Sequence, residues 1–171
     1  MRSTILKNQN GFTLLEVVLY IAIVGLLLTT VGLLVNATNQ AKAREAIRQE
    51  VEEQGSHVLE VITSTVRNAS ALTTPAISST GAVLSVDVDI SSASPTAFTL
   101  VDGALFITEG SGTPVALTNT HVVATDFVVQ NLSYAGTPGT IRVNFTLSSL
   151  TGSVSNAFVY TQTFYGTASL R

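Results

Sequence analysis

The sequence predicts an α+β fold, in which one long N-terminal helix packs on a small antiparallel β-sheet head. The first observation is an apolar run over residues 12–35, enough for about seven helical turns. The second is the absence of proline before Pro75, so that no proline breaks a helix over residues 12–72. The third is a change of the apolar period to two after Gly81, which is typical of half-buried strands.

The apolar run contains one carboxylate, Glu16, which limits how the run can be interpreted. About 20 helical residues cross a hydrocarbon core of roughly 30 Å, so residues 12–35 can span a membrane. A charge there costs at least roughly 2.5 kcal/mol at the bilayer centre and less toward the interface, so Glu16 needs a partner or a shallow position. Arg2 and Lys7 precede the run without any acid, which favours a cytoplasmic N-terminus.

Three common kinds of apolar segment are compatible with this run on its residues alone. A cleaved secretory signal would use the small residues Ala41 and Ala43, although its apolar part spans only roughly 7 to 15 residues. A plain signal anchor fits the length and leaves Glu16 unexplained. A buried core helix would require this small chain to cover the run on every side.

Residues 36–72 predict an amphipathic helix that continues the first one. Ala, Glu, Gln and Arg are dense, and the charged residues fall mostly off one apolar stripe. Gly55 interrupts this helix and is interpreted as a tolerated glycine, with a bend as the alternative. His57 is expected to be a surface or packing residue rather than a ligand. The stripe consists of Ile47, Val51, Val58, Ile62, Val66 and Ala69.

Residues 73–171 predict the head, an antiparallel sheet of about five to seven strands. Residues 82–90 alternate between an apolar and a polar face. Asp102-Gly103 joins residues 97–101 to residues 104–107, which predicts a hairpin with a type I′ turn. Further strands are expected within residues 115–117, 126–134, 140–147 and 157–168. Aromatic residues of the head, which are Tyr134, Tyr160, Phe164 and Tyr165, are expected to pack across strands rather than form a carbohydrate platform.

Composition argues against several classes of function. A net charge of −3 with scattered Lys and Arg gives no basic patch, so direct nucleic-acid binding is not expected. The chain has no cysteine, and His57 and His121 lack neighbours at metal-ligand spacing. Asp87 and Asp89 share a strand face but supply too few ligands for calcium. We therefore expect no enzyme activity, no cofactor and no metal.

The N-terminal motif resembles the type IV prepilin signature, which type IV pilins and type II secretion pseudopilins share. The resemblance rests on Gly11-Phe12-Thr13-Leu14-Leu15-Glu16 and on Ile21-Ala22-Ile23-Val24-Gly25. It implies that a prepilin peptidase removes residues 1–11 by cutting after Gly11, and that Phe12 becomes an N-methylated terminus. It also implies that the Phe12 ammonium pairs with the Glu16 carboxylate, usually between subunits, and so sets the register of assembly.

The resemblance further implies a non-enzymatic filament subunit in a type IV pilus or a type II secretion filament. Its partners would be other pilin or pseudopilin subunits and the inner-membrane assembly machinery. Residues 12–35 would anchor it as a single-pass inner-membrane protein, N-terminus in, before incorporation. Leu33 stands where many major pilins have proline, and residues 62–69 resemble the GspJ/PilW-like branch, so a minor pilin or pseudopilin is favoured. The alternative is a signal-anchored protein that presents a ligand-binding or adhesive β domain.

Overall fold

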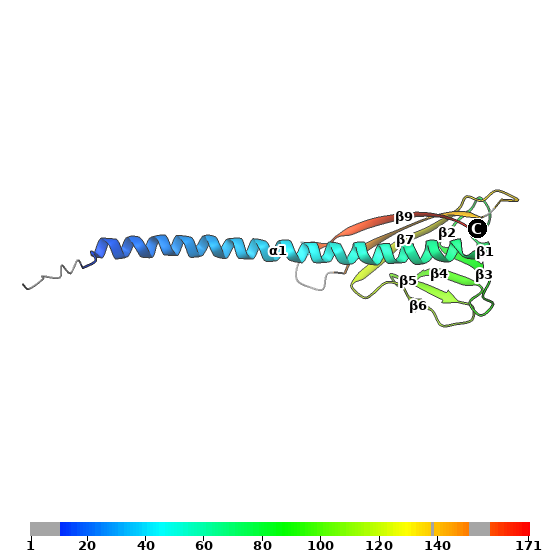
Figure 1. The fold of residues 1–171 in the computed structure, drawn as a ribbon, viewed down its shortest axis with the longest axis horizontal. Coiled ribbons are helices and arrows are strands. Elements are labelled where there is room, and N and C mark those ends of the chain that lie inside the picture. Colours follow the sequence, from blue (N-terminus) through cyan, green and yellow to red (C-terminus); the bar gives the residue numbers. More distant parts are fainter. Residues whose placement is uncertain (1–10, 138, 151–157) are drawn as a thin grey trace, which may run out of the picture. The chain divides into compact units, whose positions relative to one another are not determined.

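The computed structural model describes residues 11–137, 139–150 and 158–171. The chain divides into two units, Met1–Ala43 and Arg44–Arg171, and each is described by itself. One helix, α1 (Leu14–Arg67, 54 residues), contributes to both units, as the sequence predicts (Figure 1).

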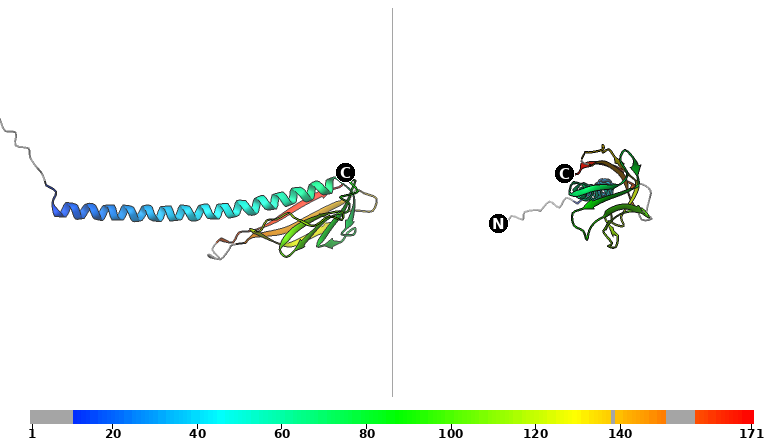
Figure 2. Two further views of the ribbon diagram at one scale, coloured as in Figure 1. Left: turned by 90° about the horizontal axis from the view of Figure 1, so that it is seen from below. Right: turned by 90° about the vertical axis from the view of Figure 1, so that its right-hand side faces the viewer.

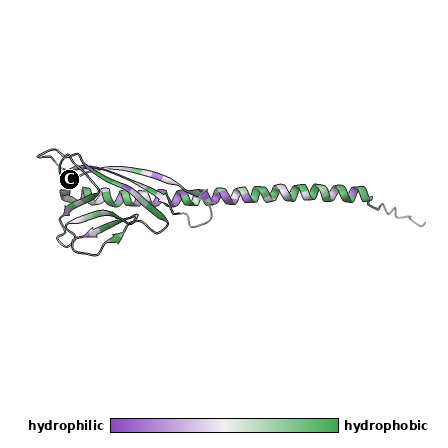
Figure 3. Cartoon of the chain, turned by 180° about the vertical axis from the view of Figure 1, so that it is seen from behind, coloured by the Kyte–Doolittle hydropathy of each residue, from purple (hydrophilic) through white to green (hydrophobic). Residues whose placement is uncertain are grey.

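In the first unit, α1 is an apolar helix whose side chains point into solvent. Its large apolar residues from Leu14 to Val35 are all exposed. An 18-residue window within α1 reaches a mean hydropathy of 2.6, so the helix is long and apolar enough to cross a membrane. Figure 3 shows this portion of the helix as mostly hydrophobic.

In the second unit, α1 buries one stripe against the β-strands, which curve around it in the end-on view of Figure 2. The predicted stripe residues Val51, Val58, Ile62 and Val66 are fully buried. Gly55 lies between them and is also buried. The predicted amphipathic face is therefore confirmed from Val51 to Val66, and the glycine belongs to it, whereas Ile47 is half-buried and Ala69, although buried, lies beyond the end of the helix.

The helix ends at Arg67, so the predicted end at residue 72 is wrong. The Asn68 amide donates to the carbonyls of Ser64 and Thr65, both at 3.2 Å, and closes the last turn. The chain then enters β1 (Ala69–Thr74), which pairs with β3 (Val83–Val88). Ladder hydrogen bonds and the strand preference of threonine outweigh a weak helical pattern here.

The head contains two antiparallel sheets rather than the single sheet predicted. The first has the order β1-β3-β4-β5-β6, and the second has the order β2-β7-β8-β9. Short strands without apolar alternation, β1 among them, carry no signal of their own and form by pairing. The remaining strands are β2 (Thr80–Gly81), β4 (Thr96–Val101), β5 (Ala104–Glu109), β6 (Val115–Ala116), β7 (Val122–Asn131), β8 (Thr140–Ser149) and β9 (Thr161–Ser169).

Local turn chemistry agrees with the structure at the β4–β5 hairpin. Asp102 and Gly103 both have positive φ, 47° and 78°, as a type I′ turn requires.

Two other predicted strand boundaries differ from the structure. Strand β7 begins at Val122, earlier than predicted. Asp126 has a positive φ of 57° at a bulge between Thr125 and Val128, which shifts the alternation along this strand. The last strand is predicted from residue 157; residue 157 lies outside the described residues, residues 158–160 are not strand, and β9 begins at Thr161.

Aromatic residues of the head have different environments. Phe164 stacks on Phe145 with ring centroids 5.4 Å apart and is buried, as expected. Tyr160 is half-buried and donates to Glu52 on α1 at 3.2 Å. Tyr134 and Tyr165, however, are 77% and 70% exposed, so the expectation of cross-strand packing is wrong for these two. Tyr134 follows the end of β7 and lies outside the strands, and Tyr165 lies on the exposed face of β9.

Candidate functional site

The N-terminal end of α1 is defined by a side-chain cap. Thr13 precedes the first helical residue, Leu14, and its hydroxyl accepts a hydrogen bond from the Glu16 amide at 3.3 Å. Its carbonyl accepts from the Val17 amide at 3.2 Å. Thr13-x-x-Glu16 is the capping-box pattern, although Glu16 here reaches forward to Tyr20 instead of back to the cap. The cap fixes where the helix starts relative to Gly11 and Phe12.

Glu16 lies in a small cluster with two aromatic residues. The Tyr20 hydroxyl donates to Glu16 Oε1 at 3.1 Å, one helical turn further on. The rings of Phe12 and Tyr20 meet edge to face, with centroids 6.4 Å apart. Glu16 is consequently half-buried, whereas the residues around it from Gly11 to Tyr20 are exposed. One carboxylate oxygen, Oε2, has no protein donor among the described residues and remains available to a cation.

The peptide link that the prepilin resemblance singles out lies in the open. Gly11 and Phe12 precede the helix, and Phe12 is 75% exposed. Among the described residues, and apart from Gly11 itself and its two chain neighbours, no heavy atom lies within 4 Å of a β-carbon built on Gly11. The structure therefore brings Phe12 and Glu16 onto one end of α1, with the Gly11 backbone beside them.

Polar groups within the apolar portion of α1 are satisfied by the helix itself. The hydroxyl of Thr29 donates to the Gly25 carbonyl at 2.8 Å, and that of Thr30 donates to the Leu27 carbonyl at 2.8 Å. Such internal bonds remove the cost of placing a hydroxyl in lipid or in a protein core. Glu16 is thus the one charged side chain between Gly11 and Val35.

The chain was compared with family models, with curated proteins and with solved structures. Residues 6–32 match the family model described as the prokaryotic N-terminal methylation motif. No curated protein and no solved structure matches the chain. The N-terminal segment is that of a type IV prepilin-like protein. In this prepilin-like chain, the matched residues contain Gly11, Phe12, Thr13, Glu16 and Tyr20 together.

Two residues of this cluster, Thr13 and Tyr20, were not singled out from the sequence. The capping-box spacing was a signal for Thr13. The spacing of Tyr20 four residues after Glu16, which puts them on one helix face, was a signal for the hydrogen bond.

The remaining candidate residues do not form a site with one another. His57 and His121 are exposed. Asp87 accepts hydrogen bonds from the hydroxyls of Thr73, at 3.2 Å, and Ser94, at 3.4 Å. Within the part of the chain that the structure describes, no group of three or more His, Cys, Asp or Glu side chains is arranged to hold a metal ion.

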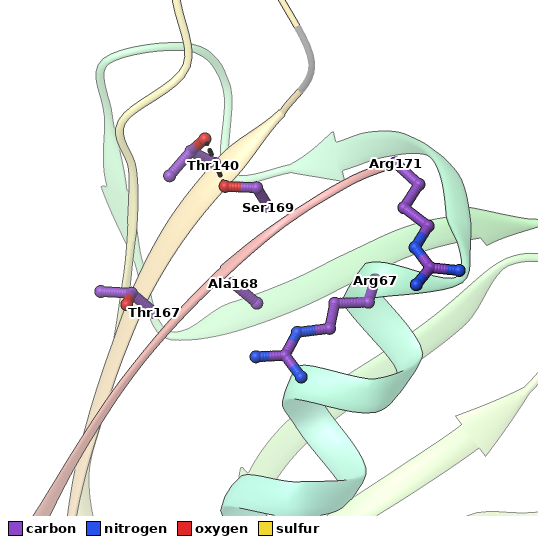
Figure 4. Close-up of a pocket in the computed structure, with 6 residues that line it drawn as sticks. All are labelled: Arg67, Thr140, Thr167, Ala168, Ser169 and Arg171. Atoms are coloured by element: carbon purple, nitrogen blue, oxygen red, sulfur yellow. Dashed lines mark hydrogen bonds between the residues drawn. The ribbon is translucent and has the colours of Figure 1, made fainter.

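The head also has shallow hollows beside β9. One of about 520 Å³ lies between the end of α1 and β9 (Figure 4). Two guanidinium groups, Arg67 and Arg171, line it, together with the hydroxyl pair of Thr140 and Ser169, whose oxygens lie 3.0 Å apart. A second hollow lies further along β9, and Thr167 lines both.

Proposed function

We propose that this prepilin-like chain is a non-enzymatic structural subunit, a minor pilin or pseudopilin, of a type IV pilus or type II secretion filament. The match of residues 6–32 to the methylation motif is the observation that carries the proposal. Residues 1–11 form the leader, and a prepilin peptidase cuts between Gly11 and Phe12. The exposed backbone at Gly11 supports access for such a peptidase. Residues 1–10 lie outside the described residues.

Removal of the leader creates a charge that Glu16 is placed to neutralise. The new ammonium on Phe12 stays positive after methylation and lies about one helical turn from the carboxylate. Oε1 of Glu16 is held by Tyr20, which leaves Oε2 for the amine of the same or a neighbouring subunit. An uncompensated buried charge costs about 3–5 kcal/mol, so only subunits in the correct register assemble without that cost.

The apolar surface of α1 supplies the driving force for assembly. Large apolar residues such as Leu14, Leu15 and Ile21 are more than half exposed in the isolated chain. Burial of one such side chain contributes about 1.5–3 kcal/mol before ordering costs. Residues 12–35 first occupy the inner membrane as a single span, with the N-terminus in the cytoplasm, and then pack in the filament core. Glycines 25 and 32 have open space around them and permit close helix approach.

The first test is the N-terminus of the mature protein. In a host with a prepilin peptidase, intact-mass measurement of the membrane-extracted chain should find methylated Phe12. Gly11→Ala should abolish removal of the leader. An intact N-terminus at Met1 in the unmodified protein would instead support a signal anchor, and a mature chain starting near residue 44 would support a secretory signal.

The second test separates processing from assembly. Glu16→Gln should be processed normally but should enter sheared filaments much less than the unmodified chain. Glu45→Gln is the matched control, because Glu45 is an exposed carboxylate on the same helix. Equal incorporation of Glu16→Gln and Glu45→Gln would refute the register role of Glu16.

A further inference from the structure

The outer face of the β2-β7-β8-β9 sheet carries polar and aromatic side chains in two adjacent cross-strand rows. Strand pairing aligns Gln130, Arg142 and Thr167 in one row, and Asn144 with Tyr165 in the next. These side chains line a shallow hollow of about 460 Å³. We call Gln130, Arg142, Asn144, Tyr165 and Thr167 the outer-face patch.

The patch differs from the rest of its own strand pair in hydrogen bonding. On either side of it, hydroxyls on β8 and β9 satisfy each other, with Thr146 and Thr163 oxygens 2.9 Å apart and Thr140 and Ser169 oxygens 3.0 Å apart. By contrast, no patch side chain makes a hydrogen bond to another described residue. Arg142 also has no carboxylate of a described residue within ion-pair distance. The one ion pair among the described residues joins Arg48 to Glu52. The patch therefore offers several free donors and acceptors to a ligand.

Tyr165 provides the apolar part of the surface. Phe164 and Ala168, on the other face of β9, are buried in the core, whereas the Tyr165 ring is 70% exposed. An exposed tyrosine presents an apolar ring with a polar tip, which suits ligands that are apolar on one side and hydroxylated at the edge. Sugar rings have this character.

We propose that the outer-face patch binds a sugar that carries a carboxylate, such as a uronic acid unit of a polysaccharide. Tyr165 stacks against the C–H face of the ring. Arg142 receives the carboxylate through paired N–H donors, which is the geometry that guanidinium groups favour. The side-chain amides of Gln130 and Asn144 and the Thr167 hydroxyl bond the ring hydroxyls.

Charge favours an acidic sugar over two other ligands. A neutral sugar would leave the Arg142 guanidinium without a counter-charge in the occupied patch. A single-stranded nucleic acid needs a basic groove along its backbone, whereas this patch holds one arginine in a chain of net charge −3. Thr167 also lines the neighbouring hollow that contains Arg67, at the end of α1, and Arg171, which follows β9 (Figure 4). In a chain of acidic sugars, a second unit would meet these two guanidinium groups.

The proposal is tested by calorimetry on the full chain in detergent micelles, with an oligogalacturonate as the acidic probe. A galactan oligosaccharide of the same length is the neutral probe, and an oligothymidylate is the nucleic-acid probe. Saturable binding of oligogalacturonate alone is expected. Tyr165→Ala and Arg142→Gln should each weaken it about tenfold or more, whereas Tyr165→Phe should retain it.

Matched controls use residues outside the patch. Tyr134→Ala removes another exposed tyrosine and Lys42→Gln removes another exposed cation, and neither should change affinity. Absence of saturable binding, equal affinity for the neutral probe, preference for oligothymidylate, or equal losses in patch and control variants would each overturn the proposal. These outcomes do not depend on leader processing or filament assembly, so the proposed function can fail or hold separately.

Discussion

Helix α1 and strand β9 approach each other closely at Gly55, and substitution there tests how the head is packed. A β-carbon added at Gly55 would overlap the ring of Phe164, which belongs to β9. That ring cannot simply rotate away, because it is stacked on the fully buried Phe145. Gly55→Ala therefore forces α1 and β9 apart or expels the ring from its stack.

The magnitude follows from three opposing effects. Overpacking of a core costs about 1–3 kcal/mol, and loss of an aromatic pair adds about 0.5–1.5 kcal/mol. Replacement of a helical glycine by alanine stabilises the helix by about 1 kcal/mol, because alanine has the higher helix propensity. The expected net loss in free energy of unfolding is about 2 kcal/mol. For a head of this size, the loss lowers Tm by roughly 8 °C.

The assay is urea and thermal unfolding of the full chain in detergent, followed by near-ultraviolet circular dichroism of the tyrosines. Phe164→Leu shortens the opposing side chain and so tests the cause. The double variant Gly55→Ala with Phe164→Leu should lose less free energy of unfolding than the two single variants lose together, by at least about 1 kcal/mol. Gly55→Ala at unchanged or raised stability, or strictly additive losses, would refute this packing argument.

Two further predictions concern polar groups of the head. Asn131 is 2% exposed, donates to the Pro75 carbonyl at 2.8 Å and accepts from the Ser133 amide at 3.0 Å, so Asn131→Ala should cost about 2 kcal/mol in urea unfolding. Asn144→Ala is the control, because this half-buried side chain makes no hydrogen bond to another described residue, and an equal effect of the two substitutions would contradict the assigned role. The hydrogen bond from Arg48, at 2.8 Å, holds the pKa of Glu52 below its usual value. The pKa of Glu52 is lower in the folded chain than in the unfolded chain. The stabilisation of the folded state by ionised Glu52 is therefore complete above the unfolded pKa of about 4.3, and it is lost as the pH falls through the folded-state pKa. The stability difference between the unmodified chain and Glu52→Gln should therefore shrink between about pH 6 and about pH 3, and a constant difference would contradict the linkage.

Local sequence signals predicted those elements whose cause is local. The period of Val51, Val58, Ile62 and Val66 determines one helix face, and the Asp102-Gly103 pair determines its turn. These features depend on backbone preferences and on neighbours within a few residues.

Elements that form through distant partners could not be predicted in this way. Residues 69–72 look helical in isolation and become strand because Ala69 pairs with Val88. The bulge at Asp126 hides the start of β7, and the division of the head into two sheets depends on strand order. Pairing of this kind is decided by long-range contacts rather than by intrinsic propensity.

For the candidate sites the same division holds. The sequence alone determined the prepilin-like motif around Gly11, Phe12 and Glu16, because the proposed cleavage and charge pairing involve residues that lie close together along the chain. Only the tertiary structure decided that Gly55 is a contact point, because Phe164 reaches it from β9. It also decided that Tyr165 is exposed beside Arg142, since the face on which a strand residue lies depends on which side of its sheet is covered.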